Sequence, residues 1–230
     1  QYDRNASVKT FRVFTVLSTM GLLMLFARGT AAHRPIGDTG EDTIRLPNIT
    51  TSFVVYRNLQ RADQIDRFAF HADGGEKLHV GINIPAIRGL ETYGVSVAIV
   101  GPGLDGDDIE LLPVAAPEGS GTMIIPSRVG DEFFEPFTQT SYWGRQQADI
   151  HIPQSGEYVL LVWSPDGQAG KYVIDTGTQE VFGLDDLLRF PVWWLRVHHY
   201  FGHTPYLIML VISGIATFVV LAIRRHRAAR

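Results

Sequence analysis

The sequence contains no cysteine, and this absence excludes several kinds of chemistry. Without cysteine the chain has no disulfide framework, no thiolate metal site and no cysteine nucleophile. Its stability must come from an ordinary hydrophobic core. Once the hydrophobic ends of the 230-residue chain are set aside, enough sequence remains for one medium-sized domain with such a core.

Sequence motifs of common enzyme classes are also missing. The chain has no Gly-x-Ser-x-Gly nucleophile elbow outside its hydrophobic segments, no phosphate-binding Walker loop and no His-Glu-x-x-His metalloprotease motif. The serines are scattered and fall mostly in expected turns. We therefore expect a protein that is not an enzyme and has no cofactor, with a calcium or copper ion as the alternative.

The net charge of −4 conceals a strong segregation of charge along the chain. Residues 33–204 carry 12 Lys and Arg against 23 Asp and Glu, which is a net charge of −11. Both ends of the chain, in contrast, are basic. An acidic middle region argues against a nucleic-acid partner and against docking on anionic lipid.

The first hydrophobic segment has the composition of a secretory signal peptide. Residues 13–26 are largely apolar, follow basic residues, and precede a region of small residues that ends at Ala32. The apolar stretch is shorter than the ~20 residues needed to cross a bilayer. We predict a signal peptide over residues 1–32 that is cleaved after Ala32, with a retained N-terminal anchor as the alternative.

The second hydrophobic segment has the properties of a transmembrane helix. Residues 205–223 carry no charge, and at ~1.5 Å rise per residue they nearly match the hydrocarbon thickness. The Arg-Arg-His-Arg sequence that follows obeys the positive-inside rule, whereas a buried core helix rarely ends in this way. We predict a membrane span over 205–223, a cytoplasmic tail over 224–230, and a periplasmic or extracellular location for the rest.

The segment 183–204 is dense in aromatic residues and contains one proline. Trp and Tyr favour the headgroup level of a membrane because an apolar ring carries a polar group. We predict a short amphipathic helix, either on the outer leaflet or packed against another membrane protein. The expected partners are the lipid bilayer and other integral membrane proteins, contacted through Trp193, Trp194, Tyr200 and Phe201.

Residues 33–182 show the pattern of short strands separated by Gly, Pro and Asp turns. Residues 77–84 alternate between apolar and polar, as expected of a half-buried strand. Two further strands, 158–163 and 171–175, flank a Ser-Pro-Asp-Gly turn and are predicted to form a hairpin. We predict an all-β domain, an antiparallel β-sandwich of the jelly-roll type.

The strand and turn motifs of this domain resemble those of the bacterial pre-peptidase C-terminal domain. The motifs are residues 63–70, 74–80, 95–103, 153–162 and 170–174, in that order and at similar spacing. In that family a small jelly roll is appended to a secreted enzyme as a noncatalytic binding or stabilising module. The resemblance implies such a module here. The chain differs in lacking an attached peptidase and in an insertion around residues 131–145.

Two groups of residues are candidate metal ligands. Asp105, Asp107, Asp108 and Glu110 place oxygen ligands beside glycines, as a calcium loop requires, although the spacing is not that of an EF-hand and a solvated acidic loop has the same composition. Cleavage after Ala32 would make His33 the N-terminal residue, whose amine and imidazole nitrogen could both bind copper if the fold supplied a second histidine.

The other histidines have less specific interpretations. His79 and His151 fall on the polar faces of expected strands, which favours solvent exposure. His198, His199 and His203 cluster next to the predicted span, where an imidazole is compatible with the membrane surface.

Aromatic residues are also concentrated in the predicted insertion. Phe133, Phe134, Tyr142 and Trp143 lie close to an arginine, which is the composition of a protein-contact hot spot. A loop folded over the end of the sandwich would have the same composition.

The sequence therefore predicts a noncatalytic, membrane-anchored, extracytoplasmic module, most simply an accessory or stabilising subunit of a larger membrane protein complex. A periplasmic copper- or calcium-binding protein is the alternative, and an uncharacterised hydrolase is a more distant one.

Overall fold

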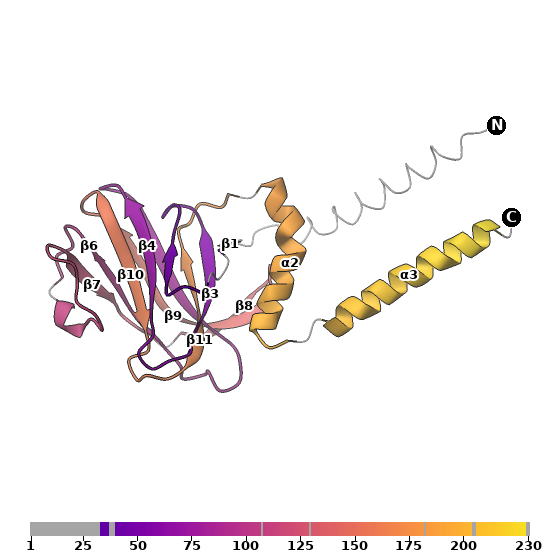
Figure 1. Cartoon of the computed structure of the whole chain (residues 1–230), viewed down its shortest axis with the longest axis horizontal. Helices are drawn as coiled ribbons and strands as arrows, with labels where there is room; N and C mark the ends of the chain where they lie inside the picture. Colours follow the sequence, from indigo (N-terminus) through magenta and orange to yellow (C-terminus); the bar gives the residue numbers. More distant parts are fainter. Residues whose placement is uncertain are drawn as a thin grey trace.

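A computed structural model gives the structure of the chain over most of its length. It describes residues 33–36, 40–106, 108–128, 130–181, 183–203 and 206–228. The predicted signal peptide, residues 1–32, and one candidate calcium ligand, Asp107, lie outside the described residues. The described part is mostly β: two sheets form a sandwich, one helix packs beside it, and a second helix extends away (Figure 1).

One layer of the sandwich is a six-stranded sheet, called sheet A here, with the strand order β1-β3-β11-β5-β9-β8. Its strands are β1 (Arg34–Pro35), β3 (Phe53–Leu59), β5 (Lys77–Pro85), β8 (Glu132–Glu135), β9 (Thr140–His151) and β11 (Gly170–Thr176). All its pairs are antiparallel except β1 with β3.

The other layer, sheet B, has five strands in the order β2-β4-β10-β6-β7. They are β2 (Thr43–Arg45), β4 (Ile65–Ala72), β6 (Ser96–Gly101), β7 (Gly121–Ile125) and β10 (Gly156–Trp163), with a 3₁₀ helix, η1 (Asp108–Leu111), between β6 and β7. Strand β2 runs parallel to β4. The predicted sandwich is thus confirmed, but both sheets are mixed rather than purely antiparallel.

The predicted hairpin between residues 158–163 and 171–175 is wrong. Strand β10 pairs with β4 and β6 in sheet B, whereas β11 pairs with β3 and β5 in sheet A. The connecting turn therefore crosses from one sheet to the other. Pro, Asp and Gly supply the dihedral angles of a reversal in either case, so turn composition could not distinguish a hairpin from a crossing.

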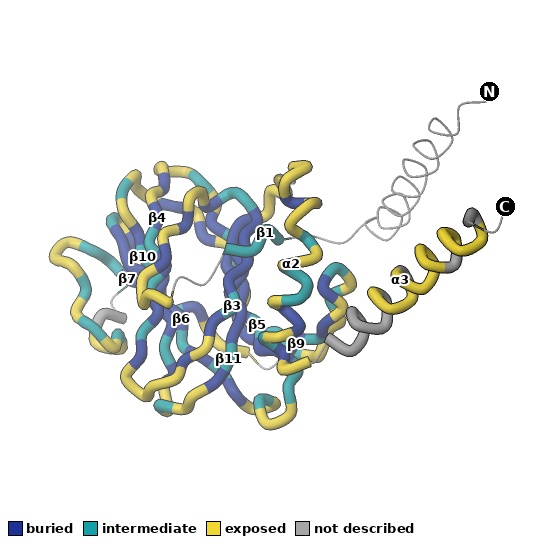
Figure 2. The backbone as a smooth tube through the Cα atoms, turned by 45° about the vertical axis from the view of Figure 1, so that its right-hand side comes forward, coloured by how far each residue is buried: buried dark blue, intermediate teal, exposed yellow. Residues whose placement is uncertain are grey.

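The core lies between the two sheets and is built by alternation along the strands. On β5, Leu78, Val80, Ile82 and Ile84 are all fully buried, as the alternating pattern predicted. Phe68 and Phe70 of β4 face them from sheet B and are also fully buried. Figure 2 shows buried backbone running through the strands of both sheets.

The segment predicted to lie at a membrane surface forms helix α2 (Leu184–Tyr200), which continues through Pro191. Its C-terminal end packs on the outer face of sheet A. Val197 of α2 and Phe201, the residue after the helix, form a second apolar cluster with Val54, Tyr142 and Val173 of sheet A. Figure 2 shows α2 exposed near its start and buried near its end, so part of its aromatic surface is covered by the sandwich itself.

Helix α3 (Tyr206–Ala228) follows α2 after a short connection. Within the part of the chain that the structure describes, no helix has the length and apolarity required of a membrane span. The predicted span begins at Pro205, which lies outside the described residues, as do several side chains along α3.

A buried ion pair joins the two sheets inside the core. Asp66 of β4 accepts hydrogen bonds from Arg57 Nε at 2.9 Å and from the Arg57 terminal nitrogen at 2.8 Å. Gln64 donates to the same carboxylate at 2.9 Å and the Tyr172 hydroxyl donates at 2.6 Å. Burial alone would raise the pKa of Asp66, but these hydrogen bonds hold it below its ordinary value.

Replacing Asp66 by asparagine should destabilise the fold strongly. The Asp66→Asn substitution leaves Arg57 buried without its counter-charge, a loss that typically costs about 3–5 kcal/mol. Urea unfolding at neutral pH measures this cost. Asp63→Asn is the matched control, because Asp63 is exposed and a surface change of this kind costs less than ~0.5 kcal/mol.

The same pair gives the sign of a pH effect. Since the folded-state pKa of Asp66 is lowered, its contribution to stability is complete above the unfolded pKa of about 3.9. That contribution is lost as the pH falls through the folded pKa. The difference in unfolding free energy between the wild type and Asp66→Asn should therefore shrink at pH 3, and an equal difference at both pH values would contradict this assignment.

Candidate functional site

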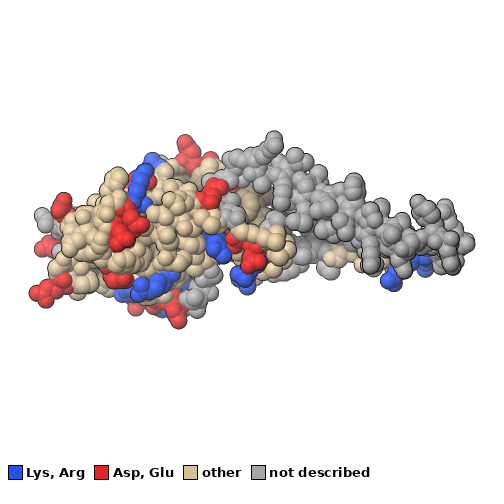
Figure 3. Space-filling view, turned by 90° about the horizontal axis from the view of Figure 1, so that it is seen from above, with Lys and Arg blue, Asp and Glu red and all other residues tan. Residues whose placement is uncertain are grey.

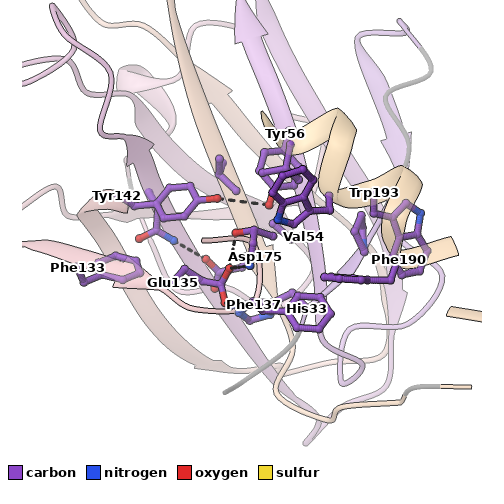
Figure 4. A pocket seen from close by; sticks show the side chains of 16 residues that line it. His33, Val54, Tyr56, Phe133, Glu135, Phe137, Tyr142, Asp175, Phe190 and Trp193 are labelled. Carbon is purple, nitrogen blue, oxygen red and sulfur yellow. Dashed lines mark hydrogen bonds between the residues drawn. The ribbon is translucent and has the colours of Figure 1, made fainter. Parts of the chain in front are cut away.

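A cleft lies on the outer face of sheet A, between the sandwich and α2. It consists of two adjoining cavities, an apolar one of about 80 Å³ and a polar one of about 560 Å³. Four residues line both cavities: His33, Asn83, Phe133 and Asp175. Figure 4 shows His33 and Asp175 near the middle of the lining, with aromatic side chains around them.

The apolar cavity lies under α2. Its aromatic lining comes from sheet A, from the loop between β8 and β9, and from α2: Tyr56, Phe133, Phe137, Tyr142, Phe190, Trp193 and Trp194. The hydroxyl groups of Tyr56 and Tyr142 lie 3.4 Å apart. Burial raises the pKa of both phenols, so both stay neutral at physiological pH.

Asp175 of β11 forms the floor between the two cavities. In the sheet register it lies opposite Gly81 of β5, where any Cβ would collide with the Asp175 carboxylate. Asn83 Nδ2 donates to Asp175 Oδ1 at 2.7 Å. Burial raises the pKa of Asp175, and the neighbouring His33, His79 and Asn83 partly offset this effect.

His79 lies on the same face of β5 as Gly81 and Asn83, in the polar cavity. Its Nδ1 is 2.7 Å from Asp149 Oδ1, and because a carboxylate only accepts, Nδ1 carries the hydrogen. Lys77 also contacts Asp149, at 2.8 Å, and the hydrogen bonds from Lys77 and His79 lower the pKa of Asp149. His79 Nε2 lies 3.7 Å from Asp175 Oδ2.

The side chain of His79 is only 16% exposed, so the expectation that it faces solvent is wrong. The alternating pattern placed His79 on the polar face of β5, but this face lines the cleft, where neighbouring residues cover most of the side chain. His151, at the end of β9, is exposed as expected.

His33 reaches the cleft from the other side. It immediately precedes β1, and its Nδ1 lies 2.5 Å from the Ser52 hydroxyl oxygen. Its imidazole lines both cavities and contributes to the electrostatic field at Asp175. The fold therefore brings a second histidine, His79, into the cleft that His33 lines, although the two are 46 positions apart in sequence.

The side chains in the described ranges form no group of three or more His, Asp or Glu that could hold a metal ion. Of the predicted calcium ligands, Asp105 and Glu110 are exposed, the Asp108 side chain lies outside the described residues, and the calcium prediction remains untested. Residues 101–106 also have Gly-x-Gly-x-x-Gly spacing after β6. Only the short η1 and an antiparallel strand follow them, so the helix of a dinucleotide-binding unit is absent at this place.

The residues predicted to contact a partner differ in burial and do not form one surface in the structure. Phe133 and Phe134 of β8 are 43% and 60% exposed. Tyr142 is buried against α2, and Trp143 is half-buried against the main core. Trp193 and Trp194 are half-buried in the lining of the apolar cavity, while Tyr200 and Phe201 pack on sheet A. Whether Phe133, Phe134 or the tryptophans contact a partner stays a prediction.

Among the cleft residues that were not identified from sequence are Asp175 and Asn83, and Asp149, which contacts His79, was also missed. The sequence did contain a signal for Asn83 and Asp175. Residues 79, 81 and 83 share one face of the predicted strand, and the central glycine of that face leaves room for a side chain from a neighbouring strand. The identity of the facing strands depends on pairings that are distant in sequence, and these could not be read from the chain.

Neither the known family models nor the curated proteins include a match to this chain. Among solved structures, PliG from Aeromonas hydrophila, a periplasmic inhibitor of g-type lysozyme, has 14% identity and a TM-score of 0.36, over 64% of this chain and 100% of its own. The pre-peptidase C-terminal domain of a Bacillus anthracis collagenase has 12% identity and a TM-score of 0.31, over 61% of this chain and 99% of its own.

A third similar structure is CorA of Methylomicrobium album BG8, a surface-associated copper-binding protein, with 11% identity and a TM-score of 0.34 over 60% of this chain and 98% of its own. The second of the three belongs to the family that the sequence motifs resemble. Identities and TM-scores this low assign neither a family nor a function to the chain.

Substituting Gly81 by alanine should disturb the floor of the cleft. The added methyl group would collide with the Asp175 carboxylate, and relieving such overpacking costs about 1–3 kcal/mol. Gly94→Ala is the control, because a Cβ at Gly94 meets no atom within 4 Å. Urea unfolding should show a loss of stability for Gly81→Ala only. Equal stability of the two variants would show that the carboxylate is not held over Gly81.

Proposed function

We propose that the protein is a noncatalytic extracytoplasmic module, anchored by residues 205–223, that serves as an accessory or stabilising subunit of a larger membrane protein complex. The observation that carries this proposal is the two-sided nature of α2. One side of the helix is fixed to the sandwich, and the other presents apolar side chains outward.

The fixed side makes α2 part of the folded domain. His198 Nε2 donates to the Thr138 carbonyl oxygen at 2.9 Å, and burial lowers the pKa of His198, which favours the neutral imidazole. The Tyr200 hydroxyl lies 2.8 Å from the Arg57 carbonyl oxygen and 2.9 Å from that of Tyr172. Near the start of the helix, Arg34 pairs with the buried Asp186 at 3.1 Å.

The outward side of α2 carries a stripe of three exposed apolar residues. Leu184 and Leu188 are each 68% exposed and Val192 is 49% exposed. Their spacing of four residues puts them on one side of the helix. Because a short connection joins α2 to the proposed anchor α3, the partner that fits best is another integral membrane protein, which contacts this stripe.

Two features support the proposed anchor. Residues 205–223 contain no charged residue and precede an arginine-rich tail. Along α3, the large apolar side chains Ile215, Phe218, Val219, Val220, Leu221 and Ile223 are exposed, between 41% and 74%. A lipid environment would cover them.

The charge of the domain supports a location away from polyanions. Residues 33–204 carry a net charge of −11. In the view of Figure 3, acidic and basic side chains are interspersed over the sandwich rather than gathered into one basic surface.

The anchor can be tested by truncation. A chain that ends after His203 should fold, because the sandwich and α2 are intact, but carbonate washing should release it from the membrane, since only the contact with its partner would hold it there. The full chain should stay with the membrane after carbonate washing. If the truncated chain remains with the membrane after carbonate washing, residues 205–223 are not the anchor.

The stripe can be tested by a double substitution. Leu184→Glu with Leu188→Glu should leave folding and membrane attachment unchanged but release the protein from a larger complex in mild detergent, because losing a contact residue in an interface costs about 2 kcal/mol or more. Met123→Glu is the matched control, since Met123 is 39% exposed on β7, away from α2. Native electrophoresis measures the size. A wild-type protein that migrates alone would contradict the accessory-subunit proposal.

A further inference from the structure

Strand β8 forms an edge of sheet A that is open to further pairing. In the described part of the chain its only strand partner is β9, with Glu132 opposite Trp143 and Glu135 opposite Thr140. An edge strand turns alternate backbone N–H and C=O groups away from its sheet, and such unpaired groups are a template for another strand.

The other edges of the two sheets are short or covered. Strands β1 and β2 have two and three residues. Along β7, the Thr122 amide donates to the Gly106 carbonyl oxygen at 3.4 Å, and a Cβ at Gly121 would collide with the Leu104 carbonyl group. The segment 104–106 therefore contacts β7 and uses one of its backbone donors. Within the described ranges, β8 has no backbone hydrogen bond to a segment other than β9.

The four residues of β8 have the pattern acidic–apolar–apolar–acidic. Phe133 and Phe134 are 43% and 60% exposed, and successive residues of a strand face opposite sides of the sheet. Phe133 faces the same side as Tyr142, with ring centroids 5.7 Å apart, and Phe134 faces the other side together with Glu132. An added strand would therefore find an aromatic ring on each of its faces.

The apolar cavity lies beside β8, and Phe133 belongs to its lining (Figure 4). An apolar cavity of ~150 Å³ holds a benzene molecule. The cavity of about 80 Å³ therefore fits an aliphatic side chain better than an aromatic ring. A residue placed opposite Phe133 on an added strand points to the same side of the sheet as Phe133, toward this cavity. Pockets of this kind give specificity when an extended peptide joins a sheet.

The acidic ends of β8 argue against a second copy of the chain as the added strand. Two β8 strands paired over their full length around a two-fold axis would place each Glu132 opposite a Glu135, and like charges directly opposite destabilise a strand pair. The amides of Phe137 and Thr138 each donate to Glu135 at 2.7 Å, so its charge stays at the end of β8. Asp131, exposed beside Glu132, adds to the repulsion. Basic residues at the same two positions would be attracted instead.

We propose that β8 is the docking site for an extended segment of another extracytoplasmic protein, which adds a strand to sheet A and has the pattern basic–apolar–apolar–basic. The main chain of the segment pairs with the open edge of β8. Its basic side chains lie opposite Glu132 and Glu135, and its aliphatic side chain opposite Phe133 enters the apolar cavity. This interaction goes beyond the accessory-subunit proposal, which is carried by the stripe on α2.

The test uses the full chain in detergent, labelled for nuclear magnetic resonance, and two synthetic peptides with blocked ends. The basic peptide is Thr-Lys-Val-Leu-Lys-Thr and the acidic one is Thr-Glu-Val-Leu-Glu-Thr. We expect the basic peptide to bind about tenfold more tightly, because its charges are opposite to those of β8. Its binding should shift the backbone amide signals of β8 and slow their hydrogen exchange. Equal binding of the two peptides, or shifts confined to other strands, would overturn the proposal.

Backbone pairing is tested separately by methylating alternate peptide nitrogens. An added strand directs only every second N–H group toward β8. Methylation of one alternate set should therefore weaken binding about tenfold, whereas methylation of the other set should leave it nearly unchanged. A peptide held only by its side chains would respond alike to both modifications, and that result would contradict strand addition.

The charge requirement is tested on the protein with Glu132→Lys. This substitution turns an attraction into a repulsion and should weaken binding of the basic peptide about fivefold. Glu118→Lys is the matched control, because Glu118 is also exposed but lies in the loop before β7. An equal loss in both variants would indicate general charge attraction only and would overturn the proposal. Neither variant alters Leu184 or Leu188, so failure here is distinct from failure of the accessory-subunit proposal.

Discussion

The charge of Asp66, buried between the two sheets, is the constraint on which the functional side of the molecule depends. A buried carboxylate must be paired and hydrogen-bonded, and its partners Arg57 and Tyr172 come from β3 and β11 of the opposite sheet. The backbone carbonyl oxygens of these same two residues face outward and accept from Tyr200. The pair that joins the sheets therefore also positions the surface on which α2 docks.

Docking of α2 turns the outer face of sheet A into a cleft. An isolated sandwich would leave the polar face of β5 in water, where an alternating strand normally places it. Here the helix and the β8–β9 loop cover one side of that face with aromatic rings, while Arg128 and Gln147 line the open side. Asp175 lies at the boundary, where the lower polarity strengthens its interactions with nearby cations.

The sequence predicted what depends on local pattern and missed what depends on distant pairing. Alternation over 77–84 identified β5 and its buried side chains, because a period of two is a local property. The Ser-Pro-Asp-Gly turn was recognised, but the sheet that each flanking strand joins depends on β3, β4 and β6, far away in the chain. The aromatic density of 183–204 predicted a helix that needs a covering surface, and part of that surface is sheet A.

The same difference between local pattern and distant pairing explains which residues of the candidate site could be predicted. His33 was singled out because a cleavage pattern is written in consecutive residues. His79 was assigned to solvent because nothing nearby in sequence shows that Arg128 and the residues around the start of β8 line the cavity on its face. Asp149 and Asp175 approach His79 only through the pairing of β5 with β9 on one side and with β11 on the other. A central strand flanked by two carboxylates, with a histidine and a glycine on its covered face, is a feature of the assembled sheet and of no single segment.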